Sequence, residues 1–215
     1  MHGSRFRDGV RAGLPLALAP LLFGAAFGVL AIEADMGRVA AVVMSATTFA
    51  GSAQFAAASI LDTGGGAAAA IVAAVLLNAR YAPLSIAVAS IFPGSVRRRL
   101  VESQLIVDES WALAGRGGRF EYGTLAGVGV LFWLLWVGGT LVGTLVGDLF
   151  DPRAIGLDAA FPALFLALLV PYLRTRRARA AALTAAGITL ALIPVAPAGL
   201  PVVAASLACL WGLAR

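Results

Sequence analysis

The sequence is poor in charge and in reactive side chains. Only 13% of its 215 residues are charged, about half the share expected of a soluble domain, and none is lysine. It has a single cysteine, Cys209, and a single histidine, His2. These counts exclude an intrachain disulfide and argue against a zinc hydrolase or a serine–histidine intramembrane protease. Without lysine there is no G-x-x-x-x-G-K-[ST] loop for ATP, and we expect neither a metal nor a cofactor.

Apolar residues, in contrast, make up 60% of the chain, and the mean hydropathy is +0.93. Such a chain cannot cover a water-facing surface, so the solvent we infer is the lipid bilayer. A transmembrane helix needs about 20 apolar residues. Seven blocks come near that length: Leu14–Ile32, Val39–Leu61, Gly66–Phe92, Tyr122–Phe150, Leu157–Leu173, Arg179–Ile193 and Gly199–Leu213. We therefore predict an all-α polytopic membrane protein with about six to seven transmembrane helices in one domain over residues 1–215.

Arginines between these blocks predict the orientation of the chain. The net charge is +5, but the arginines lie where topology signals lie, so we expect no nucleic-acid partner. The N-terminal tail (1–13), the amphipathic linker (93–121) and the loop after Leu173 are arginine-rich and are predicted to be cytoplasmic, as are both termini. The tail and the linker flank an N-terminal group of helices (14–92), and a C-terminal four-helix part (122–215) follows. We interpret Leu14–Ile32 as a retained first span rather than a cleaved signal peptide.

This orientation raises a problem of parity. Arg11 and Arg97 are both predicted to be cytoplasmic, yet three apolar blocks separate them, and three simple crossings would place them on opposite sides. Either the second or the third block is re-entrant or broken, or the cluster around Arg97 lies outside. We favour a broken element in the N-terminal half.

The second block carries polar residues at membrane depth. Gly51 and Ser52 lie near its centre, and Gly-Ser pairs are sites of helix breaks. Ser45, Thr48 and Ser52 share one helical side, which is equally typical of close helix packing. Gln54 is harder to explain by packing, because an amide is costly in hydrocarbon unless it is paired.

The third block has Asn78 and Arg80 at its centre, followed by Tyr81. A central arginine is expensive in a bilayer and is a functional candidate by default. The alternatives are a snorkelling arginine and a structural ion pair. Pro83 lacks an N–H, so it should leave the carbonyl of Ala79 without its helical partner. Such groups could bind the carboxylate and ammonium of a small zwitterion at a broken helix.

Three acids are candidates for coupling to protons. Asp108 and Glu109 are adjacent near the end of the linker, and repulsion between them would raise the pKa of one. The alternative is a solvated pair. Asp158 begins the fifth block, where it could equally favour the helix N-terminus.

Several pieces of the sequence together resemble the AzlC family, the large subunits of bacterial branched-chain amino acid exporters. They are P-L-L-F-G-A-A-F-G, S-A-T-T-F-A-G-S-A-Q-F, N-A-R-Y, V-D-E-S-W-A-L and G-L-D-A-A-F-P-A-L-F-L-A-L-L, over roughly residues 9–175. The family tends to have His where this chain has Tyr81, and Thr where it has Val107. The missing histidine removes one possible titrating group.

The resemblance implies a transporter of the bacterial inner membrane. It would export branched-chain or related neutral aliphatic amino acids, driven by protons, together with a small AzlD-like membrane subunit. By position, it assigns substrate and coupling roles to Gly51, Ser52, Gln54, Phe55, Asn78, Arg80, Asp108, Glu109 and Asp158, to which we add Tyr81. The alternatives are a transporter of another small metabolite and a non-transporting membrane scaffold.

Overall fold

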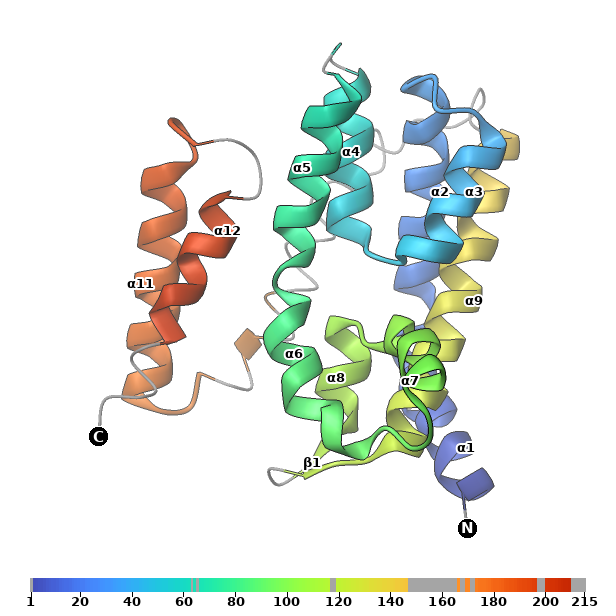
Figure 1. The fold of residues 1–215 in the computed structure, drawn as a ribbon, viewed down its shortest axis with the longest axis vertical. Coiled ribbons are helices and arrows are strands. Elements are labelled where there is room, and N and C mark those ends of the chain that lie inside the picture. Colours follow the sequence, from blue (N-terminus) through green and yellow to red (C-terminus); the bar gives the residue numbers. More distant parts are fainter. Residues whose placement is uncertain are drawn as a thin grey trace.

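The computed structural model of the chain describes residues 2–62, 64, 66–116, 119–146, 166, 169–170, 173–196 and 200–209. The described chain is almost entirely helical, as predicted (Figure 1). Its first span is bent rather than straight. Helix α1 (His2–Gly13) and the 3-10 turn η1 (Leu14–Leu16) meet helix α2 (Leu18–Glu33) at a bend of 65°. Pro15 is the middle residue of η1, and proline is a common cause of such kinks because it cannot donate the helical hydrogen bond. The segment predicted as an N-terminal tail (1–13) is therefore helical from His2 to Gly13.

The second apolar block is a hairpin of two short helices. Helix α3 (Arg38–Thr48) and helix α4 (Gly51–Asp62) are separated by Phe49 and Ala50. Phe49 has a left-handed backbone (φ 41°), which breaks the helix. In Figure 1, α3 descends from the end of α2 to mid-height and α4 climbs back to the same end. The chain therefore turns back within the second block, and the break comes two residues before the predicted Gly51–Ser52 position.

The third block runs through the molecule. Helix α5 (Ala67–Asn78), helix α6 (Tyr81–Val88) and the turn η2 (Ala89–Ile91) form a continuous 25-residue apolar helix with a local irregularity at Ala79 and Arg80. The expected orphan carbonyl of Ala79 is satisfied, because the amide of Ala82 donates to it at 3.1 Å. The first and third blocks each run between the two ends of the molecule and the second turns back, so α7 (Val96–Glu102) lies at the same lower end as the N-terminus (Figure 1). Arg11 and Arg97 therefore lie at the same end of the molecule, although three apolar blocks separate them in the sequence.

The linker is only partly a surface segment. Helix α7 is exposed, but after the turn η3 (Ser103–Leu105) the chain enters the molecule, and Ile106 and Val107 are 6% exposed. Helix α8 (Asp108–Ala114) then returns towards the lower end. A two-stranded hairpin follows, β1 (Gly115–Arg116) and β2 (Arg119–Phe120).

Helix α9 (Tyr122–Val146) is the second long apolar helix, and it packs along α1 and α2. Glycines make this contact close, as the G-x-x-x-G spacing predicts. A Cβ on Gly139 would overlap the carbonyl oxygen of Leu21, and one on Gly143 would overlap that of Ala25. The third predicted glycine, Gly147, lies outside the described residues.

Two adjacent glycines of α9 test this packing. We expect Gly139→Ala to destabilise the protein by about 1–3 kcal/mol, because the backbone of α2 must move to admit the methyl group. Gly138→Ala is the matched control, since a Cβ there meets nothing within 4 Å. Thermal unfolding of both variants in detergent measures the difference, and equal melting temperatures would contradict it.

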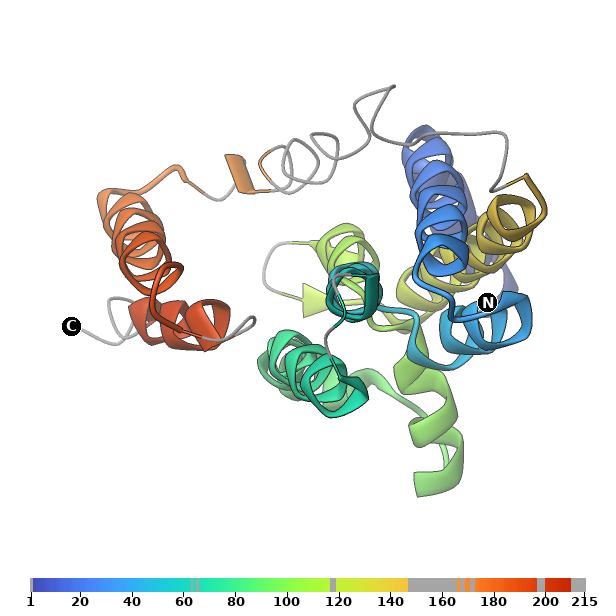
Figure 2. The same ribbon diagram turned by 90° about the horizontal axis from the view of Figure 1, so that it is seen from above.

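Helices α11 (Arg176–Leu192) and α12 (Leu200–Ala205), with the turn η6 (Ser206–Cys209), form a separate pair beside α5. Figure 2 shows them on the opposite side of the molecule from α1, α2 and α9. Among the described residues, two helices are long and apolar enough to cross a membrane, or three if the bent pair is one span. Most of the fifth block, including Asp158, lies outside the described residues.

Candidate functional site

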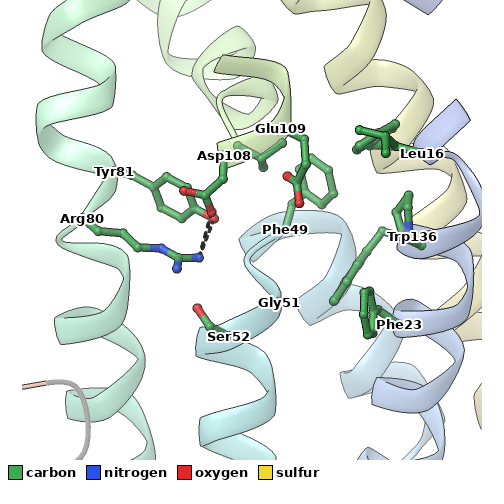
Figure 3. A pocket seen from close by; sticks show the side chains of 14 residues that line it. Leu16, Phe23, Phe49, Gly51, Ser52, Arg80, Tyr81, Asp108, Glu109 and Trp136 are labelled. Carbon is green, nitrogen blue, oxygen red and sulfur yellow. Dashed lines mark hydrogen bonds and ion pairs between the residues drawn. The ribbon is translucent and has the colours of Figure 1, made fainter. Parts of the chain in front are cut away.

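A cavity of about 40 Å³ lies where the bent first span, the hairpin tip, the α5–α6 junction and α8 converge on α9 (Figure 3). Its charged and polar wall is formed by Ser52, Arg80, Tyr81, Asp108 and Glu109. The rest of the wall is apolar: Leu16, Ala19, Pro20, Phe23, Phe49, Gly51, Val107, Phe132 and Trp136. Segments distant in sequence thus form one site, and its volume is enough for one or two water molecules.

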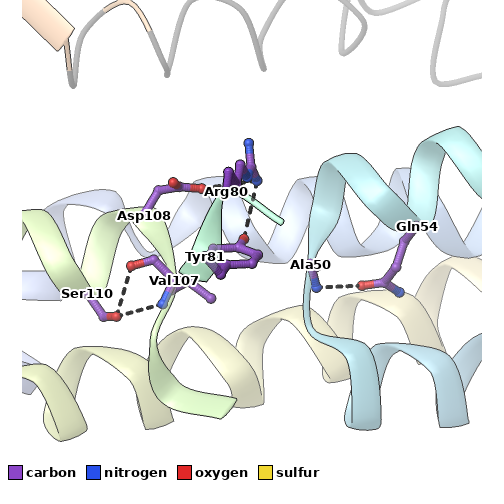
Figure 4. Close-up of polar contacts among 7 residues, drawn as sticks. All are labelled: Ala50, Gln54, Arg80, Tyr81, Val107, Asp108 and Ser110. Atoms are coloured by element: carbon purple, nitrogen blue, oxygen red, sulfur yellow. Dashed lines mark hydrogen bonds and ion pairs between the residues drawn. The ribbon is translucent and has the colours of Figure 1, made fainter. Parts of the chain in front are cut away.

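Arg80 forms the centre of the polar wall. Its Nη2 lies 3.1 Å from Oδ2 of Asp108 and donates to the hydroxyl of Tyr81 at 3.2 Å (Figures 3 and 4). The guanidinium also lies 5.0 Å from the centre of the Tyr81 ring. Both charged side chains of the ion pair are 24% exposed. The arginine and the acid, predicted separately, therefore form a half-buried pair facing the cavity.

The two acids are held by the start of α8. The hydroxyl of Ser110 accepts from the amide of Val107 at 3.0 Å (Figure 4) and donates to the carbonyl of Leu105 at 2.6 Å. Burial raises the pKa of Asp108, although Arg80 opposes the shift. Burial, with the charge of Asp108, raises the pKa of Glu109 to about 7. The pair is thus not the fully solvated one of the alternative interpretation, and Glu109 can exchange a proton near neutral pH.

Ser52 and Asn78 each have a buried oxygen without a hydrogen-bond partner among the described residues: Oγ of Ser52 and Oδ1 of Asn78. Figure 3 places Ser52 in the cavity on the side of Arg80, whereas Asn78 is absent from the lining. An unpaired buried hydroxyl is costly unless something binds it. Ser52 is therefore available to a ligand of the cavity.

Gln54 lies elsewhere, in a buried hydrogen-bond network. Its side chain is fully buried, and its Oε1 accepts from the amide of Ala50 at 3.2 Å (Figure 4) and from Nε1 of Trp136 at 3.1 Å. Its Nε2 donates to Oγ of Ser45 at 2.9 Å, and Ser45 bonds to Thr140 at 2.7 Å. Gln54 thus ties both arms of the hairpin to α9. Phe55 also lies outside the cavity lining, with its ring edge-on to Phe27 at 6.0 Å.

These positions predict different phenotypes for two neighbours. We expect Gln54→Ala to lower the free energy of unfolding by about 2–5 kcal/mol, because it leaves a cavity and several buried groups unpaired. Ser52→Ala should leave the unfolding free energy nearly unchanged and weaken substrate binding instead. Thermal unfolding and substrate titration of each variant distinguish the two effects. A stable Gln54→Ala protein with impaired binding would overturn this assignment.

Sequence reasoning missed the aromatic half of the wall. Phe23, Phe49, Phe132 and Trp136 were not distinguished from ordinary apolar residues of their blocks. The only available signal was indirect: the glycine stripe of α9 predicts close packing against another helix, and Trp136 is on that packed helix. The glycine pattern does not say which helix packs against α9.

Apolar through-helices, a re-entrant hairpin and an ion pair beside an apolar cavity are features of a polytopic membrane protein that handles a small solute. The sequence profile of the AzlC protein family matches residues 15–150. The chain belongs to this family, which confirms the predicted resemblance.

Relatives lie across bacteria and archaea. An uncharacterized membrane protein of Helicobacter pylori strain 26695 is 28% identical, covering 89% of this chain and 85% of the relative. One of Archaeoglobus fulgidus is 30% identical, covering 82% and 80%. The branched-chain amino acid transport protein AzlC of Bacillus subtilis is 25% identical, covering 86% and 75%. No solved structure gives a significant match. These relatives support a membrane location and a role in membrane transport.

Proposed function

We propose that this protein is a secondary transporter that exports branched-chain or related neutral aliphatic amino acids. The observation that carries the proposal is the cavity itself, which combines a cation and two acids with a wall of aliphatic and aromatic side chains. Its polar half suits the two charges that every amino acid carries, and its apolar half suits a hydrocarbon side chain. The transport protein AzlC of Bacillus subtilis, similar over 75% of its length, supports the same class of substrate.

The guanidinium of Arg80 is the natural partner of the substrate carboxylate, because its planar fork binds carboxylates with two parallel hydrogen bonds. The ammonium would face Asp108 or Glu109, and the free hydroxyl of Ser52 would complete the polar contacts. Arg80 is paired with Asp108 within the protein. A zwitterion can therefore replace an internal ion pair by two external ones, so that neither charge is left unpaired on binding or release.

The cavity must widen before it can hold such a substrate, since 40 Å³ admits only water. Broken helices allow such changes in transporters, because helix segments can move relative to each other around a fixed site. The hairpin tip and the first span, each interrupted beside the cavity, are the elements we expect to move.

Proton coupling is assigned to the acids of α8. Glu109, with its pKa raised to about 7, is the group that would bind and release the proton, and Asp108 would respond through its pair with Arg80. The role predicted for Asp158 stays a prediction.

The remaining parts of the proposal concern context. We place the protein in the bacterial inner membrane with both termini cytoplasmic. The arginine-bearing helices α1 and α7 lie at the same end of the molecule, which supports a cytoplasmic N-terminus. We also propose a small AzlD-like membrane subunit as partner, on the strength of the family.

Counterflow of labelled leucine tests this function in proteoliposomes, with the protein alone and with a candidate small subunit. We expect unlabelled leucine, isoleucine or valine inside the vesicles to drive uptake, and lysine not to, because the cavity offers no partner for a second ammonium besides the acids already engaged. Exchange of lysine at the same rate would contradict the substrate class. No exchange of any amino acid, in either preparation, would favour the scaffold alternative.

A further inference from the structure

A second cavity, of about 200 Å³, lies next to the first and shares two of its walls. It is lined by Thr48, Phe49, Tyr81, Ser85, Ser103, Gln104 and Ile106. Phe49 and Tyr81 also line the central cavity and are labelled there in Figure 3. These two side chains therefore stand between the two spaces.

The polar side chains of the second cavity are uncharged, whereas those of the first include Arg80, Asp108 and Glu109. Hydroxyls of Thr48, Ser85 and Ser103 and the amide of Gln104 line it, and none of the described residues that line it is charged. Ser103 and Gln104 are exposed, so the cavity opens to the surface. Its lining elements, α6 and the turn after α7, lie in the lower half of Figure 1, towards the end that carries the N-terminus. Such a lining can hydrogen-bond a hydrated solute without holding it tightly.

The partition between the cavities has an unusual backbone. Phe49 adopts a left-handed conformation that non-glycine residues rarely take, and its side chain is 6% exposed. Strained conformations of this kind are concentrated at ligand clamps and switch regions. Phe49 is also the turning point of the hairpin, so a rotation of either arm moves its ring directly. Tyr81, opposite, begins α6 immediately after the irregular turn at Arg80.

We propose that the polar cavity is the vestibule by which the solute reaches the central site from the N-terminal end, and that Phe49 and Tyr81 form the barrier between them. A zwitterionic amino acid would first exchange water for the hydroxyls of the vestibule. Movement of the Phe49 ring then admits it to the side of Arg80. This inference rests on the transport function proposed above and adds to it the route and the residues that close it.

Thiol accessibility tests the route, because the chain has one native cysteine, which Cys209→Ser removes. Single cysteines are placed in the vestibule (Ser85→Cys) and in the central cavity (Ser52→Cys, with Leu16→Cys as a second probe). A membrane-impermeant methanethiosulfonate is added from the N-terminal side of oriented vesicles. We expect the vestibule cysteine to react quickly and the central ones slowly.

Removing the barrier should change only the central probes. In the Phe49→Ala background we expect Ser52→Cys and Leu16→Cys to react about tenfold faster or more from the N-terminal side, with Ser85→Cys unchanged. Phe92→Ala is the matched control, since Phe92 is equally buried, 4% exposed, and lines neither of the two cavities. It should leave all rates unchanged.

The outcomes distinguish this inference from the proposed function. Equal rates for vestibule and central cysteines with Phe49 intact, or no acceleration in Phe49→Ala, would overturn the route even if leucine exchange persists. The expected labelling pattern without exchange of any amino acid would instead support the route as an access path and reject the amino acid as its cargo.

Discussion

Arg80→Ala is expected to abolish leucine exchange, with a loss of at least about 100-fold. Among the described residues, the substitution removes the only arginine of the cavity lining, and it leaves Asp108 half-buried without its cation. Truncating one partner of a hydrogen-bonded charge pair between protein and ligand costs about 2–5 kcal/mol of binding free energy, and a tenfold change in binding corresponds to about 1.4 kcal/mol. Counterflow of labelled leucine by purified, folded protein measures the loss. Arg80→Lys should retain a fraction of the activity, because it keeps the charge but loses the planar fork.

A double variant separates substrate binding from a purely structural ion pair. If Arg80 serves only to neutralise Asp108, then Arg80→Ala combined with Asp108→Ala should recover both thermal stability and exchange relative to Arg80→Ala alone. If Arg80 binds the substrate carboxylate, the double variant should recover stability but remain inactive. Recovery of exchange would therefore remove Arg80 from the binding site and restore the alternative of a structural pair.

The broken second block shows how far the sequence reaches. The arginine-rich ends required an even number of crossings between Arg11 and Arg97, and this argument needed no knowledge of packing. It indicated that either the second or the third apolar block is irregular, and the polar residues indicated where each block could break. The position of the break could not be predicted from the sequence, because phenylalanine has no preference for a left-handed backbone. The surrounding tertiary structure holds Phe49 in that conformation.

Gln54 shows why the site was only partly predictable. A buried amide must be paired, so the sequence correctly identified it as a residue with a specific partner. That partner could have been a substrate or the protein, and the choice depended on Trp136 in a helix 82 residues away. The same limit applies to Asp108. It lies in a segment that reads as a surface linker, and only the fold turns α8 inward to meet Arg80.

Glu109 should make the stability of the protein depend on pH up to neutrality. Its pKa rises from an ordinary value of 4.5 to about 7 in the folded protein, so the folded state binds a proton more tightly than the unfolded state. Stability from this proton is fully present below about pH 4.5 and is lost as pH rises to about 7. The melting temperature should therefore fall over this interval, apart from the effects of other groups.

Glu109→Gln replaces the protonated acid by a neutral amide of the same shape. Its melting temperature should exceed that of the unchanged protein above about pH 7 and depend less on pH. Leucine accumulation driven by a proton gradient should be lost, while counterflow, which needs no net proton movement, should continue.

Glu121→Gln is the matched control for this substitution. Partial burial tends to raise the pKa of Glu121. Hydrogen bonds from Thr124 and the contact with Arg5 outweigh this and hold the pKa below its usual value. Its loss should therefore leave the pH profile near neutrality unchanged. Gradient-driven accumulation that survives in Glu109→Gln would show that the coupling proton binds elsewhere. Loss of counterflow together with accumulation would place Glu109 in substrate binding, because a carboxylate that only carries a proton is not needed when substrate is exchanged for substrate.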